Sequence, residues 1–301
     1  MTFKQWIALG LACLVFSNSA YADTNSSVAE GAEKTKGFLW EIKSGTKTGY
    51  LFGSIHLAKL DFYPMSPAVE TAYKNAKILA VETDVTDMAA LKKVMPLTMY
   101  VAPDKLEKHL SAQTWAQLST SFGPAAEQMQ QLKPGVVATG LMIGMMTSTG
   151  YTPEAGIDLH FLKRAKADGK SVYQLETLAF QMKVLTDFSD AEGDEMLSYT
   201  IASMKDGDAM KDSEAMVVAW KSGDLPALEK IMQSSADKDA STAKLMKRLL
   251  DDRNIGMSDK VIKLINGNKP VLIVVGAGHM VSKNSILDLL QQRGLKIRRV
   301  Q

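Results

Sequence analysis

Six short stretches of the chain consist mainly of apolar and β-branched residues and are bounded by turn-forming residues. Runs of this kind, about four to eight residues long, are typical of buried β-strands. We therefore predict strands at 38–43, 50–55, 78–83, 171–176, 271–276 and 296–300. The segment between the first two strands is rich in glycine, serine, threonine and lysine. It favours a turn, so these strands should form an N-terminal β-hairpin.

Most of the remaining chain has helical spacing of its apolar residues. Ser189 and Glu192 have the spacing of a capping box, which predicts a helix N-terminus there. The stretches 87–150 and 185–262 contain no strand-like run. Helices that alternate with strands predict an α/β fold, with a central mostly parallel or mixed β-sheet flanked by helices. The two strand-free stretches predict a helical cap, and residues 37–301 should form a single domain.

The N-terminus has the pattern of a secretory signal peptide. Lys4 precedes an apolar run at 6–16, and Ala20-Tyr21-Ala22 fits a cleavage site of the small-x-small type. The apolar run is well short of the roughly 20 residues that a membrane-spanning helix needs, which argues against a membrane anchor. We predict a signal peptide at 1–22, cleaved after Ala22, followed by a flexible linker at 23–36. The mature protein would then be periplasmic or secreted from a bacterium.

Composition and cysteine content exclude several classes of protein. The chain has 35 Lys+Arg against 33 Asp+Glu, a balance that argues against nucleic acid as a partner. With 46% hydrophobic residues it is neither disordered nor a multi-span membrane protein. Its single cysteine, Cys13, lies in the predicted signal peptide. The mature chain would therefore contain no disulfide and no thiolate zinc site.

The motif G-x-x-H occurs twice, at 53–56 and at 276–279, each time at the end of a predicted strand. In open α/β sheets ligands bind outside the carboxyl ends of the strands, so His56 and His279 could share one site. Two unrelated loop histidines are the alternative. Glu82 ends the strand at 78–83. Two imidazoles and one carboxylate are a usual ligand set for a divalent transition metal that activates water. Alternatively, Glu82 caps the next helix or pairs with a lysine.

Other polar residues fall where the helical pattern expects apolar ones. Arg253 and Asn254 interrupt the apolar stripe of a predicted helix around 243–266, so they should point inward. A buried guanidinium needs a partner, which could be a carboxylate of an internal salt bridge or a bound oxyanion. Asp158 lies within the buried face of a predicted helix near 155–167, whereas His160 lies on the opposite face and should be solvated.

Two further residues have more than one interpretation. Glu176 ends a predicted strand and is a second candidate acid at the sheet edge, or it caps the helix that follows. His109, in a polar segment at a helix boundary, is expected to be structural.

Several segments together resemble the TraB/GumN family, which is related to the TIKI metalloproteases and, more distantly, to ChaN and erythromycin-esterase-like proteins. The segments are 50–56, 81–84, 156–158, 175–177 with Gln181, 252–254 and 275–279, and the resemblance spans 38–300. It implies an α/β fold with an active site around the two G-x-x-H histidines and the strand-end glutamate.

The resemblance also implies a cofactor and roles for individual residues. In the TIKI branch it accompanies metal-dependent proteolysis, with manganese or cobalt favoured over zinc. In this chain, His56, Glu82 and His279 would hold or surround the metal. Arg253 and Asn254 would stabilise charge that develops on the substrate.

These observations favour a periplasmic metal-dependent hydrolase, preferentially a peptidase that uses metal-activated water on a peptide or another small substrate. Two alternatives remain. The first is a non-enzymatic metal- or haem-binding periplasmic protein, as the ChaN-like relatives suggest. The second is a structural partner in an envelope complex.

Overall fold

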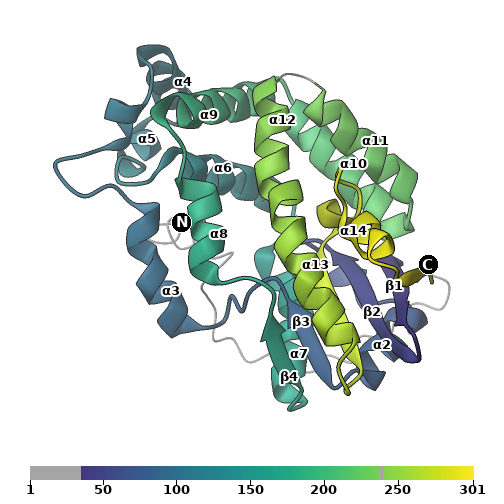
Figure 1. Ribbon diagram of the computed structural model, residues 1–301. Helices are drawn as coiled ribbons and strands as arrows, with labels where there is room; N and C mark the ends of the chain where they lie inside the picture. Colours follow the sequence, from purple (N-terminus) through teal and green to yellow (C-terminus); the bar gives the residue numbers. More distant parts are fainter. Residues whose placement is uncertain (1–34, 238–239) are drawn as a thin grey trace.

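The computed structural model describes residues 35–237 and 240–301 (Figure 1). The predicted signal peptide, with its cleavage site and Cys13, lies outside these residues, as does all but the end of the predicted linker. Among the described residues, no helix combines the length and the apolar character needed to cross a lipid bilayer.

The described residues contain one six-stranded β-sheet, and each of its strands was predicted from the sequence. The strands are β1 Phe38–Ser44, β2 Lys47–Ser54, β3 Ile78–Val81, β4 Ser171–Gln174, β5 Val271–Gly276 and β6 Lys296–Arg299. Their order is β4-β3-β5-β2-β1-β6. Strands β2, β5, β3 and β4 run parallel, whereas β1 is antiparallel to both β2 and β6. The predicted α/β fold, with a mostly parallel sheet and an N-terminal hairpin, is confirmed.

The register of the parallel strands determines where the sequence motifs emerge. Ser54 pairs with Gly276, and Val81 pairs with both Val274 and Gln174. The carboxyl ends of β2, β5, β3 and β4 therefore lie along one edge of the sheet. Residues that follow these four strands lie side by side at that edge.

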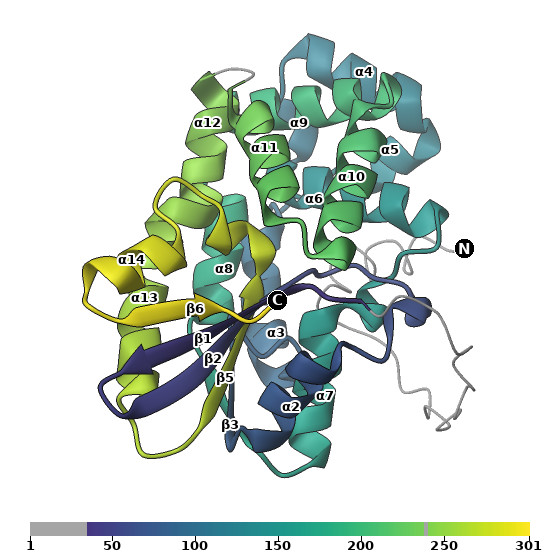
Figure 2. The same cartoon turned by 90° about the vertical axis from the view of Figure 1, so that its right-hand side faces the viewer.

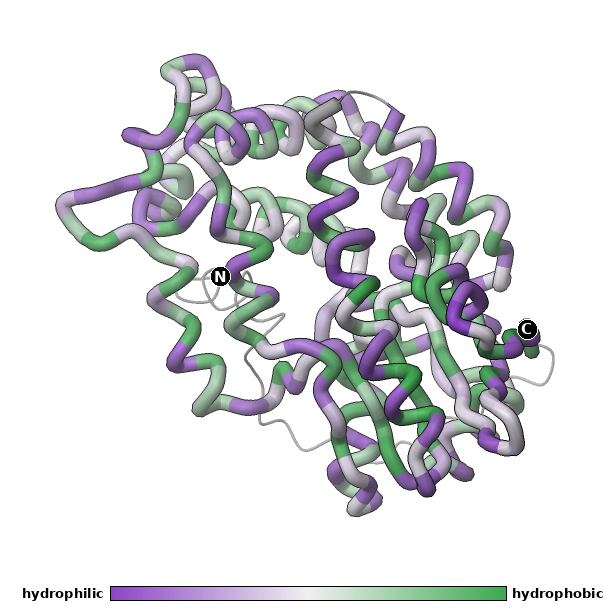
Figure 3. The backbone as a smooth tube through the Cα atoms, viewed as in Figure 1, coloured by the Kyte–Doolittle hydropathy of each residue, from purple (hydrophilic) through white to green (hydrophobic). Residues whose placement is uncertain are grey.

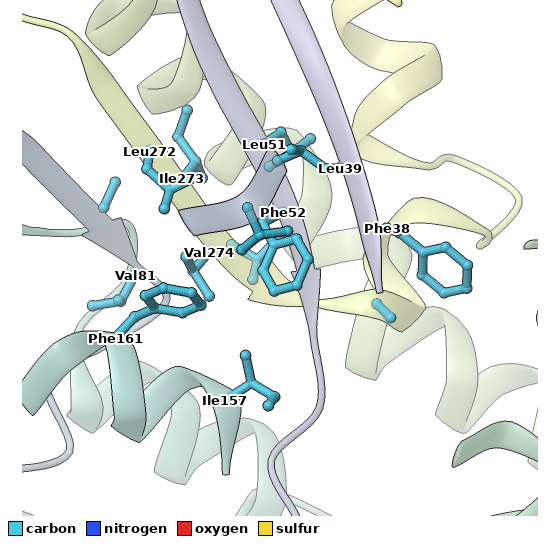
Figure 4. Packing of buried hydrophobic residues seen from close by; sticks show 14 of the residues in the cluster. Phe38, Leu39, Leu51, Phe52, Val81, Ile157, Phe161, Leu272, Ile273 and Val274 are labelled. Atoms are coloured by element: carbon cyan, nitrogen blue, oxygen red, sulfur yellow. The ribbon is translucent and has the colours of Figure 1, made fainter. Parts of the chain in front are cut away.

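Helices cover both faces of the sheet (Figure 2). Helices α2 Pro67–Asn75 and α7 Ile157–Ala167 lie on one face, and α13 Asp252–Ile265 and α14 Ile286–Gln292 on the other. Figure 4 shows Ile157 and Phe161 of α7 packing toward Phe52 and Val274 of the sheet. All four residues are fully buried, and the Phe52 and Phe161 rings meet edge to face at 6.0 Å. Burial of each such side chain contributes roughly 1.5–3 kcal/mol.

A helical layer extends beyond the carboxyl edge of the parallel strands (Figure 1). Its helices are α3 Met88–Val94, α4 Ala112–Phe122, α5 Pro124–Gln128, α6 Pro134–Ser148, α8 Leu178–Thr186, α9 Asp190–Lys205, α10 Asp208–Ser222, α11 Leu225–Ala236 and α12 Ala240–Met246. Residues such as Leu118, Val137 and Leu197, from α4, α6 and α9, form a core distinct from that of the sheet. Figure 3 shows the contrast between the hydrophobic strands and the mostly hydrophilic α12.

Short helical segments complete the connections. They are the 3-10 helices η1 Leu60–Phe62, η2 Met95–Thr98, η3 Leu106–His109, η4 Pro153–Ala155 and η6 Ala277–Met280. The capping box predicted at Ser189 and Glu192 is present at the start of α9.

The helix predicted around 243–266 contains an irregularity that the sequence did not reveal. A π-helical turn, η5 Lys247–Asp251, separates α12 from α13. The N–H of Asp252 bonds to the carbonyl of Lys247, five residues earlier. This wider turn directly precedes Arg253 and Asn254, and π turns occur frequently at functional sites.

Candidate functional site

The first G-x-x-H turn follows β2 and is fixed by contacts from two helices. Trp220 of α10 donates its indole N–H to the Gly53 carbonyl at 2.8 Å. The start of α7 packs against the same turn, where the Ile157 N–H donates to the Ile55 carbonyl at 3.0 Å. A Cβ atom on Gly156 would lie 2.3 Å from the His56 carbonyl oxygen. This close approach therefore requires glycine at position 156.

The approach of α7 brings Asp158 to the His56 imidazole. Asp158 Oδ2 lies 2.9 Å from His56 Nδ1, and Asp158 Oδ1 accepts a 2.5 Å hydrogen bond from the buried Ser54 hydroxyl. The Asp158 carboxylate raises the pKa of His56 to about 9, against an opposing effect of burial. Because 61% of the His56 side chain is exposed, salt will weaken this effect. When His56 is neutral, Nδ1 carries the proton and the lone pair is on Nε2.

The second G-x-x-H turn follows β5, and its histidine is buried. His279 lies in η6, and its side chain is 3% exposed. Its Nδ1 lies 2.6 Å from Oδ1 of the fully buried Asn254. The Asn254 amide donates to the Ser282 hydroxyl and the Asn284 carbonyl, both at 2.8 Å, which fixes its orientation. His279 therefore donates from Nδ1 and has its lone pair on Nε2. Burial lowers the pKa of His279 to about 4, so it is neutral at pH 7.

Glu82 follows β3 and lies between these elements with its two oxygens in different roles. Oε1 accepts the Gly276 N–H at 2.8 Å and lies 3.6 Å from His279 Nε2. Oε2 accepts from Arg253 Nη2 at 2.5 Å and from Gln181 Nε2 at 3.0 Å. Burial alone would raise the pKa of Glu82. Its interactions with His279, Arg253 and His56, together with the Gly276 N–H, lower that pKa well below its ordinary value.

Arg253 is held by Glu176 as well as by Glu82. Its Nε donates to both Glu176 oxygens at 3.1 Å, and Nη2 donates to Glu176 Oε2 at 2.6 Å. Nη1 donates to the Leu249 carbonyl at 2.8 Å. Of the two interpretations of Arg253, the structure contains the internal salt bridge, which engages Nε and Nη2, while Nη1 is bonded to the Leu249 carbonyl. Asn254 is similarly engaged with His279 and the 282–284 loop, so both residues position other groups of the site.

Two alternatives considered for the carboxylates are wrong. Glu176 does not cap the next helix, because the Thr177 hydroxyl accepts the Phe180 N–H at the start of α8. Glu82 does not cap α3 either, since Asp87 does so. The cation that contacts Glu82 at short range is Arg253, where the sequence suggested a lysine.

The remaining histidines lie apart from this site. His160 was expected to be solvated, but its ring is partly buried and stacks on Tyr63 with ring centres 4.1 Å apart. That prediction was wrong because Tyr63, from a distant part of the chain, covers the polar side of α7. His109 contacts Asp104 and Asp190 at 2.8–3.0 Å, in keeping with a structural role.

The two turns and β3 converge on one point beside Gly276. A Cβ atom on Gly276 would lie 3.3 Å from Glu82 Oε1, 3.6 Å from His56 Nε2 and 3.7 Å from His279 Cδ2. Residues far apart in the sequence thus contribute to a single site at the carboxyl edge of the sheet. The missing side chain of Gly276 leaves the space between them open.

The donor set at this point fits a divalent transition metal in its chemistry. Each imidazole is held through Nδ1 by an oxygen acceptor, as metal-bound histidines are, which leaves Nε2 as the donor atom. His56, Glu82 and His279 would hold the ion, with Asp158 and Asn254 orienting the two rings. In residues 35–237 and 240–301, no group of three or more His, Cys, Asp or Glu side chains could hold a metal ion as the structure places them.

Three contributors to the site were not predicted. Ser54 lies inside the first G-x-x-H motif and is buried. Its place at the end of a strand, beside a candidate histidine, could have identified it as a site residue. Gln181 is a polar residue between the buried Leu178 and Met182 of α8 and follows the strand-end Glu176 by five residues. Trp220 has no local signal, because its acceptor is the backbone of a distant turn.

Comparisons with known proteins give one family model and several relatives that match this chain. The family model described as the TraB/PrgY/gumN family matches residues 38–299. The chain is 24% identical to "Uncharacterized protein YbaP" of Escherichia coli strain K12, over 82% of this chain and 89% of that protein. It is 22% identical to a "Metalloprotease TIKI homolog" of Nematostella vectensis, over 88% of this chain and 67% of that protein. It is 21% identical to "Metalloprotease TIKI2" of Danio rerio, over 95% of this chain and 66% of that protein. No solved structure matches the chain.

Proposed function

The chain belongs to the TraB/PrgY/gumN family, and from this premise we propose that it is a periplasmic metal-dependent hydrolase that cleaves peptide bonds. The observation that carries the proposal is the convergence of His56 Nε2, His279 and Glu82 Oε1 beside Gly276. The similarity to two proteins named as metalloproteases supports the same reaction class. Manganese or cobalt is the favoured metal, with zinc as a further candidate.

The bound metal would make a water molecule nucleophilic near neutral pH and polarise the scissile carbonyl. The protein's own contribution is to orient the donors and set their charge, and His56, with its pKa of about 9, must lose its Nε2 proton before it can bind a metal. Burial keeps His279 neutral, and the contacts of Glu82 with its neighbours keep its carboxylate ionised. Asp158 fixes the ring of His56 through Nδ1.

The two sides of the site differ in access, which gives the substrate a direction of approach. His56 is 61% exposed, whereas a Cβ atom on Gly278, beside His279, would meet Met232 at 3.2 Å and Leu250 at 3.3 Å. Helix α11 and η5 therefore cover the second turn. An extended peptide would reach the site from the His56 side.

The catalytic part of the proposal is tested by incubating the purified protein with peptide libraries and Mn²⁺, Co²⁺ or Zn²⁺, and following cleavage by mass spectrometry. We expect metal-dependent cleavage that a chelator abolishes. His56→Ala and His279→Ala should each lower activity by about 100-fold, by removing a metal ligand. His109→Ala, in the helical layer, is the matched control and should retain activity.

Two outcomes would change the conclusion. Activity that is unaffected by both a chelator and His56→Ala would rule out the proposed chemistry. Metal binding without cleavage of any peptide or ester would indicate a non-enzymatic metal-binding protein.

The periplasmic location rests on the sequence pattern at 1–22. N-terminal sequencing of the protein recovered from bacterial periplasm should show cleavage after Ala22. Recovery of the uncleaved chain from the cytoplasm would refute this part of the proposal alone.

A further inference from the structure

Two buried carboxylates share the same two donors beside the proposed metal site. Oε2 of Glu82 and Oε2 of Glu176 each accept from Arg253 Nη2, at 2.5 and 2.6 Å. The same two oxygens accept from Gln181 Nε2, at 3.0 and 3.1 Å. Donors and acceptors thus alternate around a closed ring of four side-chain atoms. Glu82, Glu176 and Arg253 are at most 11% exposed.

One guanidinium between two carboxylates leaves a net charge of one negative unit in this buried ring. Carboxylates that share a site repel each other, and the repulsion favours their separation or the protonation of one of them. The Gln181 amide places one N–H on each carboxylate and adds no charge of its own. It therefore opposes the separation of Glu82 and Glu176 from the side of α8, as Arg253 does from the side of α13.

The position of Glu82 Oε2 determines where Oε1 points. With Oε2 held by Arg253 and Gln181, Oε1 faces the Gly276 N–H and His279 Nε2. Without Gln181, Glu82 would keep only Arg253 on Oε2 and the Gly276 N–H on Oε1, whereas two donors on Oε2 from separate helices restrict the rotation of the carboxylate. We propose that Gln181 is a positioning residue that aims Glu82 Oε1 into the space between His56 and His279. The link to metal affinity rests on the proposed function, in which Oε1 is a ligand.

The packing of α8 does not by itself require a polar residue at this position. Leu178 and Met182, on either side of Gln181, are buried in a hydrophobic cluster with residues of α3. Methionine is close to glutamine in size and helix propensity, so Gln181→Met should keep α8 folded while removing both hydrogen bonds. Lys183→Met changes an exposed side chain on the same helix and is the matched control.

The first measurement is Mn²⁺ affinity by isothermal titration calorimetry. Loss of a residue that orients a metal ligand weakens metal binding by roughly 10–100-fold, and we expect a loss of that size for Gln181→Met. Gln181→Glu, which replaces the amide donors with a third carboxylate, should bind more weakly still. Lys183→Met should bind as the unmodified protein does. Equal Mn²⁺ affinity of Gln181→Met and the unmodified protein would overturn the inference.

The second measurement uses the unmodified, metal-free protein. It therefore depends neither on metal binding nor on whether a variant folds. In the metal-free protein, the Gln181 side-chain amide protons should exchange slowly with solvent in NMR spectra, since both are bonded to buried carboxylates. The exposed Gln292 amide is the internal reference. Exchange of the Gln181 protons as fast as those of Gln292 would refute the hydrogen-bonded ring. If the protein binds no metal while these protons exchange slowly, the proposed function fails and the role of Gln181 in holding the two carboxylates stands.

Discussion

The two G-x-x-H turns share a sequence pattern and a position at the ends of adjacent parallel strands, yet their imidazoles have opposite surroundings. His56 is 61% exposed and faces the Asp158 carboxylate, which raises its pKa to about 9. His279 is 3% exposed and faces the Asn254 amide, and burial lowers its pKa to about 4. The motif thus determines where each ring lies, whereas its surroundings determine its charge: a carboxylate for His56 and burial for His279.

The difference arises from what each helix brings to its turn. Helix α7 begins beside the first turn and contributes a carboxylate from its first residues. Helix α13 passes over the second turn and contributes the amide of a fully buried asparagine. The His56 ring is therefore suited to a role on the solvent-facing side of the site. The His279 ring is suited to a role as a neutral, buried group. Each of the following changes affects one side of this comparison.

The largest effect should follow Arg253→Met, on the buried side. It leaves Glu82 and Glu176 without their shared cation, and breaking a buried ion pair costs about 3–5 kcal/mol. Urea denaturation followed by circular dichroism measures the change. Arg293→Met, which removes a more exposed pair with Asp259, should cost less than about 1 kcal/mol. Equal losses for both variants would show that the buried network does not stabilise the fold.

A smaller effect should distinguish Gly156→Ala from Gly278→Ala. The first Cβ would lie 2.3 Å from the His56 carbonyl, so α7 must move away from the first turn, at a cost of about 1–3 kcal/mol. The second Cβ would meet the flexible end of Met232 at 3.2 Å and should cost less. Thermal unfolding of the two variants gives the order, and the reverse order would contradict the packing described for the two turns.

Asp158→Asn should change the charge of the His56 ring much more than that of the His279 ring. Without the carboxylate, the pKa of His56 should fall from about 9 toward its ordinary value of 6.5. The pKa of His279 is set mainly by burial and only slightly raised by Asp158, so it should fall much less. NMR titration of the metal-free protein follows both rings in one experiment, so His279 is the internal control. An unchanged His56 would mean that Asp158 does not govern its charge.

The smallest effect concerns His109, outside the site. Hydrogen bonds that His109 donates to Asp190 and Asp104 raise its pKa although burial opposes the shift. The folded state therefore binds the proton more tightly, and the resulting stability is present below pH 6.5 and lost as the pH rises through the raised value. Denaturation at pH 5.5 and 8.5 should show His109→Gln losing more stability at pH 5.5. Because surface ion pairs contribute little, the difference should be small.

The fold was largely predictable because its strands are short apolar runs and its helices carry local start signals such as Ser189 with Glu192. The gathering of His56, Glu82, Glu176 and His279 at one edge also follows from sequence, since the carboxyl ends of parallel strands meet there. Their charge states could not be predicted in this way. The pKa of His56 depends on Asp158 from a distant helix, and the pKa of His279 depends on its burial by distant segments.

Other features depended on contacts that no local pattern encodes. The sequence left Arg253 open between a salt bridge and an oxyanion site, and the structure shows its salt bridge with Glu176. His160 has polar neighbours in the sequence, but Tyr63 covers it. Gln181 looks like an ordinary helix residue until Glu82 and Glu176 are brought beside it.

The π turn at Lys247–Asp251 has a consequence for comparing relatives of this chain. Each residue of an α-helix advances the side-chain direction by about 100°. A relative with one residue fewer between 247 and 251 would continue as a regular α-helix, with its later side chains rotated by that angle. An aligned Arg-Asn pair would then face away from the carboxylates and the buried imidazole. Identical letters in an alignment therefore indicate an equivalent site only where the helical phase is also preserved.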